Sequence, residues 1–164
     1  MKTQVRVSKK VNTFKVGGKT LQEAKDQLGP LEWGRFQPIA GKLNPKIDKS
    51  KKVVSVEIVG GHTIEMPVWT GYKNAPKPCQ DEWDRMWKAL DKHEQGHALV
   101  YMEGILKLEL TLSNIAEGTI TVAELATHLK NALARMEEAQ DTYETATDRG
   151  RKRGVVLDPP GECM

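Results

Sequence analysis

The feature that most constrains the fold is a long segment, residues 81–112, that contains no proline and few β-branched residues. Pro76 and Pro78 lie just before it, and the acidic residues Asp81 and Glu82 favour the N-terminal end of a helix electrostatically. The segment therefore predicts one long helix.

This predicted helix carries the sequence His93-Glu94-Gln95-Gly96-His97, which has the pattern H-E-x-x-H. Residues four apart lie on the same face of a helix, so His93 and His97 can bind one metal ion. Zinc favours nitrogen ligands at this spacing, and Glu94, about 100° round the helix, can take a proton from a water bound to the zinc. We therefore expect a Zn²⁺ site with two histidine ligands and Glu94 as the general base.

Both histidines lie on the side of the helix that carries its apolar residues. This side consists of Met86, Leu90, His93, His97, Val100, Gly104 and Leu108. Gly96 and Gly104 each cost a helix about 1 kcal/mol against alanine, and both would allow another backbone to approach. The alternative is a pair of ordinary core histidines, which would leave Glu94 as an idle charge near a buried face.

A catalytic zinc ion normally takes a third protein ligand. The metzincin pattern would place a glycine at Val100 and a histidine at Glu103, which argues against that subtype. A second helix is predicted after a turn at residues 113–118, because residues 121–124 form a capping box and apolar residues recur at helical spacing to residue 147. Helices joined by so short a turn pack antiparallel.

The second helix would pass the two histidines between residues 137 and 144, where four acidic side chains occur. Relative to its apolar stripe, Glu144 lies about 60° off and Glu137 about 80° off. Asp141 lies about 120° off, and Glu138 faces the far side. Glu144 is therefore the expected third ligand, by a small margin over Glu137. His128 lies about 100° off the stripe and is expected to be partly solvated.

The N-terminal half of the chain predicts the β part of the fold. Thr20 to Glu23 is a capping box for a short helix that Gly29-Pro30 ends. Strands are expected at residues 4–7, 12–16, 53–59 and 62–69, with Gly60-Gly61 predicting a hairpin turn between the last two. His62 would flank this turn. Pro67 suits an edge strand, which would either hold an extended peptide by β-addition or merely protect the edge.

These elements predict an α+β, zincin-like fold, in which a small N-terminal antiparallel or mixed sheet precedes two long antiparallel helices. We expect a single domain, residues 1–164. Within it, residues 1–75 are mostly β with one short helix, residues 80–150 are the helical pair that carries the site, and residues 151–164 are a tail.

Composition and charge bear on two classes of partner, nucleic acid and membranes. A chain of 164 residues with 38% hydrophobic residues and a net charge of +3 is one ordinary soluble domain, and neither nucleic acid nor a membrane is expected as a partner. The basic run at residues 149–153 is most simply a solvated helix end that complements the helix dipole. Nothing in the sequence indicates the oligomeric state.

The sequence constrains the cellular compartment of the protein less than it constrains the fold. Residues 1–10 contain no apolar segment of a secretory signal, so a cytoplasmic location is expected unless another export route is used. Cys79 and Cys163 permit one internal disulfide and leave open whether Cys163 is free. A cysteine zinc ligand from so loose a terminus is not expected.

The chain resembles a bacterial family of predicted zinc-dependent proteases that is known chiefly as a domain of unknown function. The similarity includes residues 14–21, 28–30, 64–69 and 83–87 and the H-E-x-x-H segment, and it ends near residues 143–150. It covers most of the chain, although only the H-E-x-x-H element is chemically specific. The resemblance implies hydrolysis of peptide bonds and therefore a protein or peptide substrate.

Members of this family typically end in a pattern like Tyr-Asp-x-x-Thr-x-His-Gly, where this chain has Glu144 at the Asp position and Arg149 at the His position. Arginine has no lone pair to give to a metal. If the family's ligand is the histidine, the site must use Glu144 or be impaired. If the ligand is the acid, Glu144 keeps that role, and Arg149 becomes a catalytic candidate that stabilises the oxyanion. Tyr143 is a weaker candidate for hydrogen bonding in the transition state.

We therefore expect a zinc metallopeptidase in which His93, His97 and Glu144 bind Zn²⁺. The metal would lower the pKa of a bound water toward ~7, and Glu94 would take its proton as it attacks a peptide carbonyl. Two alternatives remain open. One is a catalytically degenerate metal-binding homologue that acts as a binding module, which Arg149 favours; the other is a secreted effector.

Overall fold

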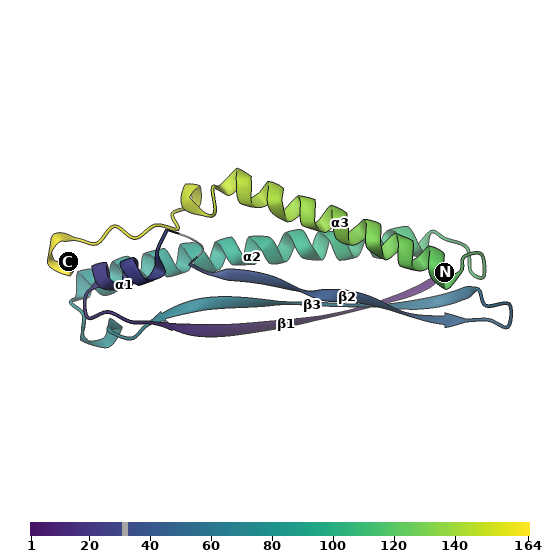
Figure 1. Ribbon diagram of the computed structural model, residues 1–164, viewed down its shortest axis with the longest axis horizontal. Helices are drawn as coiled ribbons and strands as arrows, with labels where there is room; N and C mark the ends of the chain where they lie inside the picture. The colour runs from purple at the N-terminus through teal and green to yellow at the C-terminus, as the bar shows by residue number, and fades with distance from the viewer. Residues whose placement is uncertain (31–32) are drawn as a thin grey trace. The chain divides into compact units, whose positions relative to one another are not determined.

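The computed structural model describes residues 1–30 and 33–164, which form an α+β fold of three strands and three α-helices (Figure 1). In chain order the elements are β1 (Lys2–Val16), α1 (Leu21–Leu28), β2 (Arg35–Ile47), β3 (Val53–Trp69), α2 (Lys77–Ser113) and α3 (Val122–Thr147). Short 3₁₀ helices occupy Tyr72–Asn74, Arg151–Arg153 and Gly161–Cys163. The predicted α+β class is confirmed. None of the described helices combines the length and the apolar character that crossing a membrane requires.

The strands form one mixed sheet in the order β1-β3-β2, with β3 in the centre. The amide of Thr70, directly after β3, donates to the carbonyl of Val16 at the end of β1 (2.9 Å), so these two strands run parallel. β2 is antiparallel to β3, because a tight turn joins them. In this turn Asp48 Oδ1 accepts hydrogen bonds from the amides of Ser50 (2.8 Å) and Lys52 (2.9 Å).

The predicted hairpin at Gly60-Gly61 is wrong, because both glycines lie within the continuous strand β3. They serve close packing and make no turn. A Cβ at Gly60 would lie 2.5 Å from the Tyr101 hydroxyl oxygen, and a Cβ at Gly61 would lie 2.4 Å from Ser8 Oγ. The Gly61 amide donates to the Tyr101 hydroxyl (3.1 Å). The hairpin that does form joins β2 to β3, and β2 was not predicted.

Two further expectations about the strands need correction. The separate strands expected at residues 4–7 and 12–16 are one strand, β1. β3 is not an edge strand, because it lies between β1 and β2. Arg35, the first residue of β2, lies 4.0 Å from Glu65, so Pro67 falls beyond the segment that β2 covers. Proline is tolerated there because no ladder hydrogen bond to β2 is lost.

The helices agree with the expectations. Thr20 and Glu23 form the predicted capping box of α1, and Gly29 at its end has φ 68°. Thr121 and Glu124 cap α3 in the same way, since the Glu124 amide donates to Thr121 Oγ1 (3.2 Å) and the Thr121 amide donates to the Glu124 carboxylate (2.7 Å). α2 begins four residues earlier than the proline-free segment, because Pro78 occupies its first turn, where no amide donor is needed.

The chain divides into two compact units, each built from three segments. The first unit comprises Met1–Lys9, Gln37–His62 and Ala98–Tyr143, and the second comprises Lys10–Phe36, Thr63–His97 and Glu144–Met164. In the first unit α3 packs antiparallel to α2, and the contact is close. A Cβ at Gly104 would lie 2.3 Å from Met136 Cγ, so only glycine permits this approach.

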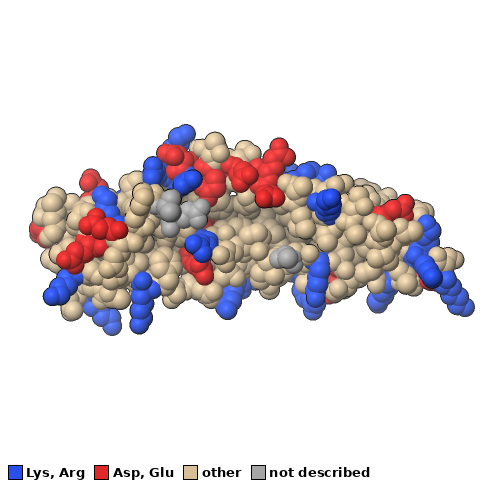
Figure 2. All heavy atoms as spheres, viewed as in Figure 1, with Lys and Arg blue, Asp and Glu red and all other residues tan. Residues whose placement is uncertain are grey.

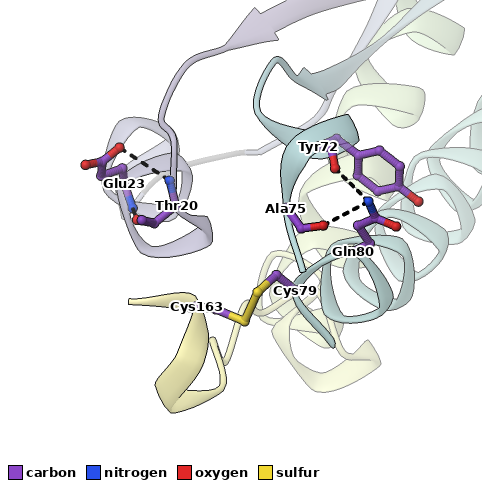
Figure 3. Close-up of a disulfide and its surroundings, with 7 residues drawn as sticks. All are labelled: Thr20, Glu23, Tyr72, Ala75, Cys79, Gln80 and Cys163. Atoms are coloured by element: carbon purple, nitrogen blue, oxygen red, sulfur yellow. Dashed lines mark hydrogen bonds between the residues drawn. A yellow bond between two sulfur atoms is a disulfide. The ribbon is translucent and has the colours of Figure 1, made fainter. Parts of the chain in front are cut away.

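The second unit has its own hydrophobic core and a disulfide. The core is formed by residues of β1, α1, β3, α2 and the C-terminal tail, among them Leu21, Ile64, Trp69, Trp83, Met86 and Leu157. Cys79 in the first turn of α2 is bonded to Cys163 in the last 3₁₀ turn (Figure 3). Beside it the Gln80 amide donates to the carbonyls of Tyr72 (2.9 Å) and Ala75 (3.1 Å). The sequence left open whether Cys163 is free, and it is not.

Candidate metal site

Three predicted ligands come together in the second unit. His93 and His97 lie one turn apart on α2, and Glu144 belongs to the last turns of α3. Oε1 of Glu144 lies 2.7 Å from Nε2 of His97 and 3.7 Å from Nε2 of His93. Both imidazoles are buried, whereas the Glu144 side chain is 30% exposed. The site is therefore assembled from two elements that are far apart in sequence.

The geometry of these three side chains fits a metal ion. One potential ligand atom from each residue lies within 4.8 Å of the others. Ligands about 2.0–2.2 Å from one zinc ion are roughly 3–3.5 Å apart, so small side-chain adjustments suffice. Oε2 of Glu144 is buried and has no hydrogen-bond partner among the described residues, as expected of a carboxylate that a cation stabilises. Two imidazoles and one carboxylate also match a known catalytic zinc donor set.

Packing fixes the two imidazole rings. Their centroids lie 4.8 Å apart in an edge-to-face arrangement, and the Phe36 ring stacks on His97 at 5.6 Å. The inward stripe of α2 is confirmed, because Met86 and Leu90 are buried together with the histidines. The rings are consequently held on one side of the helix, where a ligand pair is needed.

Burial also sets the protonation state of His93. Loss of solvation, followed by electrostatic interaction with His97 and Arg153, lowers the pKa of His93 from 6.5 to about 4. At neutral pH this imidazole is therefore neutral, and a metal ligand must be neutral to offer its lone pair.

The chain after α3 closes over His93 through a left-handed turn. Asp148, Arg149 and Gly150 have φ values of 49°, 52° and 81°. A Cβ at Gly150 would lie 2.7 Å from Val155 Cγ2 and 3.1 Å from His93 Cγ, so a side chain is excluded there by contacts as well as by φ. Backbone strain of this kind is often found at functional sites.

Glu94, the expected general base, is buried beside the histidines. Its carboxylate lies against the backbone at Gly34, where a Cβ would be only 2.8 Å from Glu94 Oε1 and 3.0 Å from Leu90 Cδ1. Gly34 was not singled out from the sequence, because a lone glycine outside a motif carries no signal of what approaches it.

These side chains border a cavity of about 130 Å³ in the second unit, which is large enough for a few waters or a small side chain. His93, Glu94, His97 and Glu144 all line it. Arg149, the catalytic candidate, also lines it and is exposed. The cavity is further lined by Arg35, Trp33, Phe36 and Arg151, which sequence reasoning did not identify. Arg149 and Arg151 belong to the basic run that was expected to be solvated, and both are exposed.

The competing acidic candidates lie elsewhere. Glu137, Glu138 and Asp141 belong to the first unit and are exposed. Acidic side chains gather over the C-terminal part of α3 on the face shown in Figure 2. Glu144 is thus the carboxylate of this stretch that reaches the histidines. Tyr143 is half-buried and also belongs to the first unit.

The other two histidines are not part of this cluster. His128 on α3 is half-buried, as expected. The prediction that His62 flanks a turn is wrong, because His62 is buried within β3 in the first unit. Its ring lies edge-on to the Tyr101 ring, with the ring centroids 6.0 Å apart. Burial and then the nearby charge of Lys9 lower its pKa. The disulfide occupies both cysteine sulfurs, so neither is available as a thiolate ligand.

Comparison with known proteins identifies a family that the chain matches. Residues 11–151 match the family described as bacterial protein of unknown function, DUF922. This span contains every residue of the candidate metal site. No curated protein and no solved structure matches the chain.

Proposed function

We propose that this chain, which belongs to the DUF922 family of bacterial proteins of unknown function, is a zinc-dependent metallopeptidase with a zincin-like active site. The observation that carries the proposal is the convergence of His93, His97 and Glu144, with Glu94 buried beside them. A structural ion pair would require neither the second histidine nor an adjacent buried carboxylate.

In this proposal His93, His97 and Glu144 hold the metal. When bound, zinc supplies a Lewis acid that activates a water and polarises a substrate carbonyl. Glu94 accepts the proton of the attacking water and passes it to the leaving amine. Gly34 leaves room for the Glu94 carboxylate, and the stacked Phe36 ring holds His97 in place.

Peptides are the substrate class that the family resemblance implies, and one feature of the sheet supports it. β2 is an edge strand, and its first two residues, Arg35 and Phe36, line the cavity. Unpaired backbone groups at a sheet edge can bind an extended peptide by β-addition. We therefore assign to the start of β2 the peptide-binding role that was one of the two expected of the strand containing Pro67.

The proposal predicts that Glu94→Gln retains zinc and loses hydrolysis. Removing a general base should lower kcat by roughly 10²–10⁴-fold, because the amide cannot accept the proton. The measurement is cleavage of casein and of a mixed peptide library by the zinc-loaded protein, with metal content determined in parallel. Lys92→Gln, at an exposed neighbouring position of α2, is the control and should cleave like the wild type. Full turnover by Glu94→Gln would refute the assignment.

A second candidate is a catalytically degenerate homologue that binds metal without hydrolysis. The observation that favours it is Arg149, which stands where relatives typically have histidine and which cannot act as a ligand. Stoichiometric zinc in a wild-type protein that cleaves none of the library would support this candidate over the peptidase.

For the compartment, we propose an oxidising environment. The Cys79–Cys163 disulfide is of a kind that persists in secreted and periplasmic proteins and is rare in the cytosol. This departs from the cytoplasmic location expected from the sequence. Thiol labelling of the protein in its native cells would show blocked cysteines if the proposal holds and reactive cysteines if it fails.

A further inference from the structure

Arginines dominate the charged lining of the cavity outside the proposed catalytic centre. Arg35 begins β2, Arg149 follows α3, and Arg151 starts the next 3₁₀ turn. The acidic residues among the described cavity lining are Glu94 and Glu144. The proposed function engages both of these carboxylates, one as ligand and one as base.

The three guanidinium groups keep donors available for a ligand. Arg35 is paired only loosely, at 4.0 Å from Glu65, and its side chain is 58% exposed. Arg151 donates from Nη2 to the carbonyl of Pro30 (3.2 Å), which positions it and leaves its other N–H groups available. The exposed Arg149 side chain forms no hydrogen bond or ion pair with the residues that the structure describes.

These contacts bear on the expected role of Arg149. An oxyanion donor is effective when it is held in place before the reaction. No described side chain holds the guanidinium of Arg149 in this way. An exposed arginine at the border of a cavity is better suited to bind a substrate group, because its planar fork matches a carboxylate in a bidentate manner.

Resting on the proposed peptidase function, we propose that the cavity selects peptides that present a carboxylate beside the bond to be cleaved. Arg149 is the principal contact, and Arg35 and Arg151 add positive charge. The carboxylates of Glu94 and Glu144 would balance the two positive charges of one zinc ion. The positive charges of the arginines therefore remain available to bind a carboxylate of the substrate. The carboxylate comes either from an Asp or Glu side chain or from the peptide's own C-terminus.

The test measures binding and does not depend on turnover. Zinc-loaded Glu94→Gln protein is titrated into fluorescent peptides of one sequence that carry Glu, Gln or Lys at one position, each with a free or an amidated C-terminus. A charge-assisted bidentate contact should tighten Kd by roughly tenfold to a hundredfold. Tighter binding of Glu peptides irrespective of amidation identifies a side-chain carboxylate, and tighter binding of free acids alone identifies the C-terminus. Equal binding of all peptides overturns the proposal.

A matched pair of charge reversals separates a local contact from bulk charge. Arg149→Glu should abolish the preference for the carboxylate and favour the Lys peptide. Lys152→Glu makes the same change in net charge at an exposed position that does not line the cavity, and it should keep the preference. Equal loss in both variants would overturn the proposal, since it would show a general electrostatic effect.

The two proposals fail separately. Carboxylate-selective binding by a protein that cleaves no peptide would refute the peptidase and leave carboxylate recognition standing. Cleavage of the peptide library by the wild type, without selective binding, would refute carboxylate recognition and leave the peptidase standing.

Discussion

Two glycines, which carry no reactive group, permit the close packing around the candidate metal site. Gly150 permits the chain to approach the His93 ring, and Gly34 permits the approach to the Glu94 carboxylate. The burial that holds His93 also keeps it neutral, since its pKa is lowered to about 4. The position and the protonation state of this candidate ligand therefore have the same physical cause.

The lowered pKa of His93 predicts that the metal-free protein loses stability in acid. Between pH 6.5 and about 4 the unfolded chain binds a proton at His93 and the folded chain does not, so the free energy of unfolding falls as pH falls. The full shift corresponds to about 3 kcal/mol. Urea unfolding of the EDTA-treated protein at pH 7 and pH 4.5 measures this loss.

His93→Gln is the control for this experiment, because every other titrating group remains. The variant should lose less stability than the wild type over the same pH interval. Parallel pH profiles for the two proteins would contradict the account.

At the scale of the elements, the sequence predicted the helices better than the strands. The helices are indicated by local signals, namely the caps at Thr20 and Thr121 and the 3.6-residue periodicity of α2 and α3. These signals sufficed to predict the helices, the turn between α2 and α3, and the position of Glu144 at the level of the two histidines. The strands depend on partners distant in sequence. Gly60-Gly61 resembled a turn because nothing local shows that Tyr101 lies against Gly60 and Ser8 against Gly61. For the same reason Arg35 and Arg151, brought in by β2 and the tail, could not be foreseen.

Gly60→Ala should destabilise the first unit by about 1–3 kcal/mol. The added methyl would lie 2.5 Å from the Tyr101 hydroxyl oxygen and 3.3 Å from Ile105 Cδ1, inside the contact between β3 and α2. Chemical unfolding of Gly60→Ala, Tyr101→Phe and the double variant measures the coupling. The double variant should lose less than the sum of the two single losses, because removal of the hydroxyl relieves the overlap. Additive losses would contradict the close approach.

At the scale of the whole molecule, the C-terminal tail is tied to the start of α2 at several points. Arg85 donates to the carbonyls of Gly154 (3.0 Å) and Val156 (2.6 Å), and the Asp158 amide donates to Glu82 (2.8 Å). The disulfide completes this attachment across a sequence separation of 84 residues. Since Val155 and Val156 line the cavity, the tail is also part of the site.

Reduction of the disulfide should lower stability by about 2–5 kcal/mol, because a long loop is released in the unfolded chain. Thermal unfolding with and without a thiol reductant measures this change, and the Cys79→Ala/Cys163→Ala variant should match the reduced wild type. An unfolding temperature that is unaffected by the reductant in the wild type would show that the bridge does not tie the tail.

The proposed function depends on His93, His97 and Glu144 binding one zinc ion, and the zinc content of the protein after dialysis against trace metal measures this binding. The wild type should retain one zinc per chain, and His93→Ala and Glu144→Ala should lose it. His128→Ala, which alters a half-buried histidine on α3 outside the cluster, should retain it. A wild type that binds no zinc, or a Glu144→Ala protein that keeps a full equivalent, would contradict the account.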